Sequence, residues 1–238
     1  MEQLPVKLGK DPIIDAIIEI RFDAGVNPNA VFGMVYAQIQ NLFPGEIFSF
    51  PISQMPVEIV DRNPELRFNP SFKVDGDKSS IQIGPHVIAI NSHMPYIGWE
   101  KFFELFKEVV NKVYGTIGQI QRLGLRYINF FEQDVHDQVD VDIRIASTNC
   151  NNFLLKAKVD NDDDMSGVVQ YTPNATVNNG EGNQLLGAVI DIDVSKNYEQ
   201  GCGKDVLLED VQRAHNSEKT LFFSLLKPDL LEQLKPNY

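Results

Sequence analysis

Segments with period-two alternation occur in groups along this sequence, and only three other segments have the spacing of a helix. Residues 14–22 alternate, with Ile18 and Ile20 facing one way and Glu19 and Arg21 the other, which predicts a half-buried strand. Strands that cluster, instead of alternating singly with helices, are typical of α+β proteins. We therefore predict an α+β fold: a large antiparallel or mixed β-sheet with about three amphipathic helices packed on it.

The three helical segments have recognisable ends. The first follows Asn27 and Pro28, an N-cap and a first-turn proline, and stops before Pro44. The second covers residues 99–114, with Gly115 as its expected cap and an apolar stripe of Trp99, Phe102, Phe103, Phe106, Val109, Val110, Val113 and Tyr114. The third covers residues 206–226, with its expected stripe at Leu208, Val211, His215, Phe222 and Leu225.

The strands fall into two groups. Residues 48–94 predict a meander of three to five strands with runs at 57–60, 65–68 and 81–83, and Asp75-Gly76 predicts a type I′ hairpin. The second group has period-two runs at 121–131, 139–145, 153–159, 168–171 and 185–194. Residues 173–184 are polar and predict a long loop.

Length and composition favour one soluble domain over residues 1–238. No run reaches the roughly 18 apolar residues that a membrane span needs. The N-terminus lacks the basic and apolar regions of a secretory signal, so we expect a cytoplasmic protein. In a reducing compartment, Cys150 and Cys202 are expected to be free thiols.

The negative charge is concentrated in the second half of the chain. Residues 1–127 hold 12 basic and 14 acidic side chains, and residues 128–238 hold 9 and 19, so the net charges are −2 and −10. Such a surface repels nucleic acid and anionic membranes and favours a basic partner protein. Asp162, Asp163 and Asp164 are the predicted binding residues of this half. The partner prediction also includes a homodimer.

Two Asp-x-Asp pairs could supply metal ligands. Asp140 and Asp142, and likewise Asp191 and Asp193, point to one face of their predicted strands, where four carboxylates could hold a divalent cation. The favoured interpretation is a solvated outer face. Residues 160–171 resemble a calcium loop, but Met165 replaces its glycine and Tyr171 its glutamate. The histidines lack zinc spacing. We therefore predict no metal and no cofactor.

No catalytic motif is present: the sequence lacks a nucleophile elbow, a phosphate loop and a dinucleotide-binding fingerprint. A triad whose members are far apart in the chain leaves no such motif. Arg122 and Arg126, together with Arg21, could form an anion-binding patch, so both are binding candidates. The alternative, pairing with Glu19 or another acid on neighbouring strands, is favoured.

Three stretches carry a family resemblance: residues 11–22, Trp99-x-x-Phe102, and residues 122–129. Together they resemble a sporadically distributed, functionally uncharacterised bacterial protein family of about 240–260 residues. The patchy distribution of that family implies genes that travel with mobile elements, defence islands or toxin–antitoxin pairs. The C-terminal third departs most from the family pattern.

These observations favour a non-enzymatic protein-binding component, for example of a mobile bacterial defence or toxin–antitoxin gene pair. The alternative is a small-ligand-binding or enzymatic domain whose site lies between sheet and helices and has no sequence motif. A structural subunit is the third hypothesis. A deep pocket with convergent polar groups would favour the alternative, and a flat acidic patch would favour a protein partner.

Overall fold

The computed structural model describes residues 4–160, 164–178 and 184–238, and it has an α+β fold. Nine strands form an antiparallel sheet in the order β10-β11-β12-β7-β2-β6-β5-β4-β3, with helices packed on it. These strands are β2 (Ile13–Asp23), β3 (Ile47–Ser49), β4 (Phe72–Asp75), β5 (Ser79–Gly84), β6 (Val87–His93), β7 (Gln119–Phe131), β10 (Leu155–Asp160), β11 (Ser166–Asn178) and β12 (Gln184–Asn197). The predicted fold class is confirmed.

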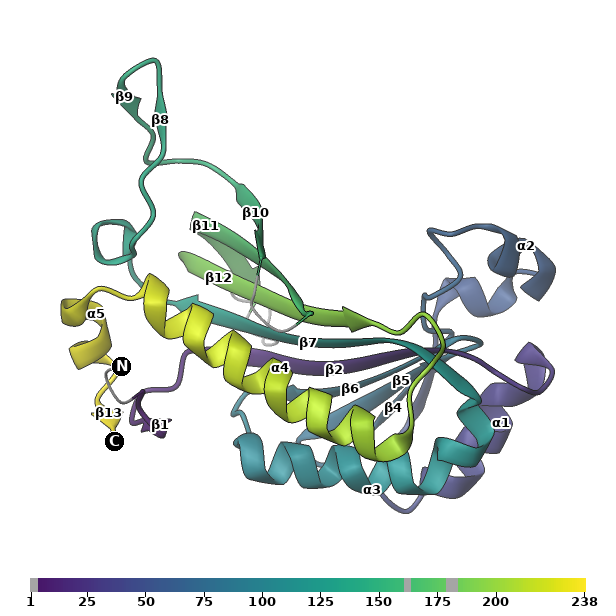
Figure 1. Ribbon diagram of the computed structural model, residues 1–238. Helices are drawn as coiled ribbons and strands as arrows, with labels where there is room; N and C mark the ends of the chain where they lie inside the picture. Colours follow the sequence, from purple (N-terminus) through teal and green to yellow (C-terminus); the bar gives the residue numbers. More distant parts are fainter. Residues whose placement is uncertain (1–3, 161–163, 179–183) are drawn as a thin grey trace. The chain divides into compact units, whose positions relative to one another are not determined.

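Five α-helices and two 3₁₀ helices complete the described part of the fold with two small sheets (Figure 1). The helices are α1 (Pro28–Ile39), η1 (Pro51–Gln54), α2 (Val57–Arg62), α3 (Trp99–Ile117), η2 (His136–Gln138), α4 (Lys204–Leu225) and α5 (Pro228–Gln233). The small sheets pair β1 (Lys7–Leu8) with β13 (Pro236–Asn237), and β8 (Arg144–Ile145) with β9 (Thr148–Asn149). No helix within the described ranges is both long and apolar enough to cross a membrane.

The chain divides into two compact units, which we describe separately. Unit one contains residues Met1–Ile14, Arg126–Val194 and His215–Tyr238, and unit two contains Asp15–Leu125 and Ser195–Ala214. The expectation of a single domain over 1–238 stays a prediction.

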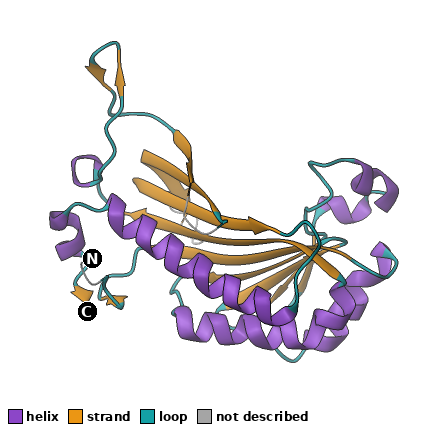
Figure 2. Cartoon of the chain, in the orientation of Figure 1, coloured by secondary structure: helices purple, strands orange, loops and turns teal. Residues whose placement is uncertain are grey.

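In unit two, helices α1 and α3 lie together on one side of the strands (Figure 2). Strand β2 turns Ala16, Ile18, Ile20 and Phe22 into this core, all at most 1% exposed, as its alternation predicts. The two helices are joined where Gln38 Nε2 on α1 donates a hydrogen bond to Thr116 Oγ1 on α3, at 2.8 Å.

Helix α3 buries most of the predicted stripe, including Phe102, Phe106 and Val113, whereas Trp99, Phe103 and Tyr114 are half-buried. The helix ends later than predicted. Gly115 lies inside the helix, and Gly118 is the residue that ends it, with φ at 65°. A Cβ on residue 118 would lie 2.3 Å from the carbonyl oxygen of Asp23, so both backbone conformation and space require glycine there.

Residues 47–93 form the four strands β3 to β6, within the predicted number, but two local predictions are wrong. Residues 57–60 lie in helix α2 instead of a strand, because Pro56 stands at its N-cap and starts a helical turn. Residues 65–68 form turns. The β4–β5 hairpin exists, but φ of Gly76 is not positive, as a type I′ turn would require.

Unit one differs from prediction in its loops. The predicted strand at 139–145 is reduced to Arg144–Ile145, which pairs only with β9 in a hairpin turned by Ala146 and Ser147, both at positive φ. That hairpin stands apart from strands β10 to β12 (Figure 1). Strand β11 continues to Asn178, so the predicted loop at 173–184 is wrong for residues 173–178, and residues 179–183 lie outside the described residues.

Helix α4 has a partly different buried face from the predicted one. Val211 and Phe222 are buried as expected, whereas Leu208, His215 and Leu225 are only half-buried. Its buried positions are Leu207, Asp210, Val211, Ala214, Glu218 and Phe222. Two carboxylic acids therefore share the buried face of this helix with apolar side chains.

Candidate functional site

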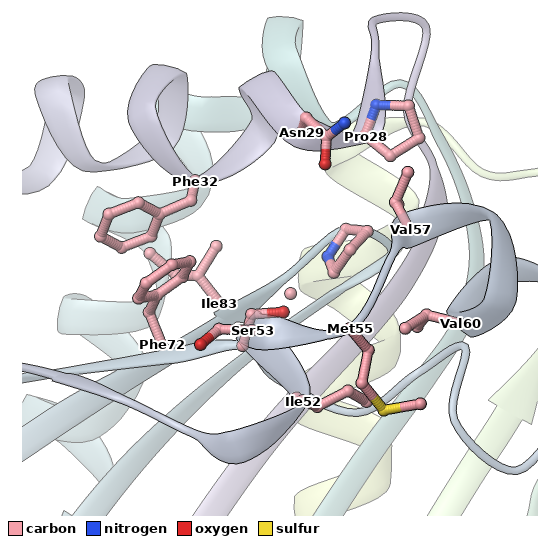
Figure 3. A pocket seen from close by; sticks show the side chains of 13 residues that line it. Pro28, Asn29, Phe32, Ile52, Ser53, Met55, Val57, Val60, Phe72 and Ile83 are labelled. Carbon is pink, nitrogen blue, oxygen red and sulfur yellow. The ribbon is translucent and has the colours of Figure 1, made fainter.

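A pocket of about 160 Å³ lies in unit two between the start of α1, the segment from η1 to α2, and strands β4 and β5 (Figure 3). Its lining consists of Pro28, Asn29, Phe32, Ile52, Ser53, Met55, Val57, Val60, Ser71, Phe72, Ile83, Gly84 and Pro85.

Local sequence signals shape the pocket walls. The Asn27 side chain accepts a hydrogen bond from the backbone N–H of Asn29 at 3.0 Å, and Pro28 starts helix α1 at this point. One turn later, the ring of Phe32 stacks on Phe72 of β4 with centroids 4.1 Å apart, which fixes α1 over the sheet. Pro51 starts η1, the opposite wall.

By residue type the lining of the pocket is mostly apolar, and its accessible surface is divided about equally between polar and apolar atoms. Asn29, Ser53 and Ser71 are the polar residues of the described lining, and no side chain in that lining is titratable. The volume is below the roughly 300–1,000 Å³ of typical small-molecule sites.

Exposed apolar side chains gather in the same part of the chain. Twelve large hydrophobic side chains are exposed among the described residues, and five of them lie between residues 34 and 59: Met34, Ile47, Phe48, Met55 and Ile59. Met55 lines the pocket itself and is 39% exposed.

A second cluster in unit two has the residue types of a catalytic triad. Ser80 Oγ of β5 and His93 Nε2 of β6 lie 2.9 Å apart, and His93 Nδ1 lies 3.3 Å from Asp15 Oδ1 of β2. Asn91 Nδ2 donates a hydrogen bond to Asp15 Oδ2 at 3.3 Å. Sequence analysis missed this cluster because its members come from three different strands.

The cluster does not have the accessibility that catalysis needs. Ser80 is 0% exposed, so no substrate carbonyl can reach its Oγ. Ser80 also lies in the middle of the sheet, opposite Asp75 of β4 and Asn91 of β6, where neighbouring N–H groups serve the ladder instead of an oxyanion hole. His93 Nδ1 and Asp15 Oδ1 are close but are not hydrogen-bonded, since Asp15 Oδ1 accepts no hydrogen bond. The cluster holds three strands in register.

Both predicted arginines are engaged in ion pairs, as the favoured alternative proposed. In unit two, Arg122 Nη1 lies 2.8 Å from Glu19 Oε1, which also contacts Arg21 Nε at 2.7 Å. In unit one, Arg126 binds Asp191 through two nitrogens. Neither guanidinium is presented as a free anion site, so their role in binding a partner stays a prediction.

The two Asp-x-Asp pairs differ from each other and from the predicted pattern. Asp140 and Asp142 are exposed in a loop, not on a strand. Asp191 is only 7% exposed and accepts hydrogen bonds from Arg126 and, at 2.9 Å, from Gln170, so it is not part of a solvated face. No three His, Cys, Asp or Glu side chains in the described part of the chain are arranged to hold a metal ion.

The predicted acidic binding residues are described only in part. Asp162 and Asp163 lie outside the described residues, and Asp164 is exposed, with φ at 63°. Other acids of the second half are exposed at positions 134, 137, 140, 142 and 209. Asp210, by contrast, is 2% exposed and paired with Lys196 and Arg213.

A polar pocket of about 430 Å³ lies in unit one beside these acids. Its lining consists of His136, Asp137, Val141, Asp142, Ile143, Asn149, Cys150, Asn151 and Lys227.

Cys150 is a half-buried free thiol, and so is Cys202 of unit two. Burial, with smaller contributions from the neighbouring Asp134 and Asp137, raises the pKa of Tyr171 to about 12.

Buried titratable groups lie on the C-terminal half of α4, in unit one. Glu218 is 5% exposed, and burial raises its pKa to about 8. Burial, with a contribution from Lys219, lowers the pKa of His215 to about 3, and His215 Nδ1 lies 3.2 Å from the hydroxyl of Tyr127. Both side chains are therefore uncharged at neutral pH, and neither lines a described pocket.

One sequence signal could have indicated the apolar pocket. Residues 24–45 contain no charged side chain, although charged residues make up 23% of the chain. A helix with buried Val31 and Val35 needs polar residues on its other faces, and α1 lacks charges there.

No protein-family model matches this chain, and no curated protein matches it either.

Proposed function

We propose that the protein is a non-enzymatic protein-binding component, and that the pocket of unit two takes an apolar side chain of its partner. The observation that carries this proposal is a pocket lined mostly by apolar residue types, with the exposed Met55 in its wall. Interface energy concentrates in such anchor pockets, which are filled by one large side chain of the partner.

The partner is also expected to have a basic surface. The exposed acids at 134, 137, 140 and 142 favour a partner with a basic surface, although Asp142 also pairs with Arg144 at 3.0 Å. Such charges raise the association rate more than the final affinity. Placing the protein in a two-gene bacterial system rests on the family resemblance alone, and the adjacent gene product is the first partner to test.

The experiment compares two exposed methionines of unit two, Met55 at the pocket and Met94 away from it, which are 39% and 62% exposed. The purified adjacent gene product is titrated against the wild type, Met55→Lys and Met94→Lys. Loss of an anchor site should weaken binding by about tenfold or more for Met55→Lys, while Met94→Lys binds within about twofold. Equal binding by all three proteins would refute the pocket as the site.

The acidic contribution is measured separately. Asp137→Asn combined with Asp142→Asn should slow association at low salt and flatten its salt dependence, because screening removes the same attraction. An association rate that ignores both salt and the double substitution would remove the basic partner from the proposal while leaving the pocket untouched.

The enzymatic alternative has one specific observation in its favour, the Ser80, His93 and Asp15 cluster. A fluorophosphonate probe reacts with serines that a histidine activates and that solvent can reach. Since Ser80 is fully buried, we expect no covalent mass shift in the wild-type protein. A stoichiometric adduct on Ser80 that disappears in His93→Gln would make the protein a serine hydrolase instead.

A further inference from the structure

Strand β3 is an edge strand of the large sheet. It pairs with β4 and has no strand on its other side within the described ranges, and Ile47, Phe48 and Ser49 are all exposed. Ile47 and Phe48 are each 46% exposed, on opposite faces of the strand. Natural sheets protect such edges with charged residues, prolines, bulges or very short strands; β3 contains no charge and no proline, and its three-residue length is its protection.

The backbone of β3 presents a defined set of free hydrogen-bonding groups at this edge. Asp75 N donates to Glu46 O at 3.3 Å, and Phe50 N donates to Ser71 O at 2.9 Å, so residues 46, 48 and 50 face β4. Because strand backbones alternate in direction, the N–H and C=O groups of Ile47 and Ser49 point outward.

We propose that β3 pairs with β3 of a second copy of this chain, antiparallel about a two-fold axis at Phe48. In this register Ile47 of each copy pairs with Ser49 of the other, so all four outward groups of each strand are used. A shift by two residues loses bonds, because Gly45 N already donates to Asp75 O at 2.8 Å and Pro51 has no N–H.

Charge favours a second copy at this edge. A two-fold interface places residues near the axis against their own copies, so any charge there would meet a like charge. Strand β3 itself carries none, and Lys73 of β4, whose Nζ lies 5.7 Å from the ring centroid of Phe48, is balanced by Asp75 at 2.8 Å. On one face Phe48 meets Phe48 of the other copy, and cross-strand aromatic pairs are favourable.

The small size of the edge sets the expected strength. Stable dimers bury about 1,000 Å² or more, and a three-residue strand with its side chains falls short of that. The dimer should therefore form only at high protein concentration. Sedimentation velocity over about 5–500 µM should show an increase from the 26.9 kDa monomer toward a dimer.

Phe48→Lys places two ammonium groups at the axis and should abolish the concentration dependence, while Met94→Lys, with the same charge change away from the edge, should retain it. Circular dichroism confirms that each variant is folded. A wild type that stays monomeric throughout, or a dimer that survives Phe48→Lys, overturns the proposal; in the second case the copies meet through another face.

Cysteine cross-linking tests the register in a Cys150→Ser, Cys202→Ser background. Directly opposed residues in this type of pair have Cα atoms about 4.5 Å apart, within disulfide range, so Phe48→Cys should cross-link to itself. Ile47 of one copy lies about 7–8 Å from Ile47 of the other, so Ile47→Cys should not. Cross-linking at neither position, or equally at both, contradicts the two-fold axis at Phe48.

Discussion

The apolar pocket and the Ser80 cluster share strand β5, yet they offer opposite kinds of surface. Ile83 lines the pocket, whereas Ser80 belongs to the polar cluster with His93 and Asp15. The cluster has the residue types of a catalytic site, but its nucleophile is fully buried. The pocket has no reactive group, but Met55 and its neighbours are open to a partner.

This difference shows that residue type alone does not indicate function. Several polar side chains on the strands find partners within the fold, among them Arg122 with Glu19 and Ser80 with His93. Such partners matter because leaving a buried polar group unsatisfied costs about 1–3 kcal/mol. The exposed apolar side chains of unit two are available for binding, and one of them, Phe48, also contacts Lys73, whose Nζ lies 5.7 Å from its ring centroid.

The largest expected effect on stability comes from helix α3, which packs on the sheet and belongs to neither the pocket nor the Ser80 cluster. Phe106 of α3 is 1% exposed, so Phe106→Ala should lower the free energy of unfolding by about 3–5 kcal/mol through lost burial and a cavity. Chemical denaturation measures it. A loss below about 1 kcal/mol would mean that the packed face of α3 is assigned wrongly.

The next effect is a pH dependence of stability caused by two buried titratable groups of helix α4. With its pKa raised from 4.5 to about 8, Glu218 binds a proton in the native state that the unfolded state has lost, so stability falls as pH rises toward 8. His215, with its pKa lowered from 6.5 to about 3, opposes this change, mostly below pH 6.5 and by about 0.4 kcal/mol above it. From pH 6.5 to 8 the unfolding free energy should therefore fall by about 1 kcal/mol.

Glu218→Gln removes the titrating group and keeps the shape of the side chain, so the same pH interval should be nearly flat in this variant. Denaturant unfolding at pH 6.5, 7.25 and 8 makes the comparison with the wild type. Identical slopes in the two proteins would show that Glu218 is ionised in the folded state.

A smaller effect is expected in the polar cluster. Ser80→Ala removes the partner of His93 Nε2, but the His93 side chain is 42% exposed and can bind water instead. The expected loss is therefore about 1 kcal/mol in unfolding free energy. A loss beyond about 3 kcal/mol would show that the cluster contributes far more to the sheet than a single hydrogen bond does.

The smallest effect on stability should come from the pocket. Met55 is 39% exposed, so Met55→Lys should change the free energy of unfolding by less than about 0.5 kcal/mol. The same substitution should have the largest effect on binding to the partner. If Met55→Lys destabilises the fold by more than about 1.5 kcal/mol, Met55 is part of the core and the pocket loses its role as a free surface.

Elements with long periodic patterns were predictable from the sequence, and the site was not. Strand β2 and helix α3 each repeat one pattern over many residues, so their buried faces were identified correctly. The pocket is built from several short segments, and one wall, at residues 57–60, was predicted as a strand because β-branched residues outweighed the signal of Pro56. Short apolar runs do not distinguish helix from strand.

The predicted arginines teach a related point. Their strand was located correctly, but the pairing of Arg126 with Asp191 depends on which strands are neighbours in the sheet. Sequence periodicity gives the face of a residue and leaves the order of strands open. The same limit concealed the Ser80 cluster, whose members meet only because β2, β6 and β5 are adjacent.

Hydrogen exchange of the chain with and without its purified partner tests the central claim most directly. The pocket account predicts slower exchange on binding at residues 28–36 and 51–60, which form its walls, and unchanged exchange around Ser80 and His93. Protection centred on the Ser80 cluster, or a tightly bound partner that leaves both pocket walls unprotected, would contradict the pocket as the protein-binding site.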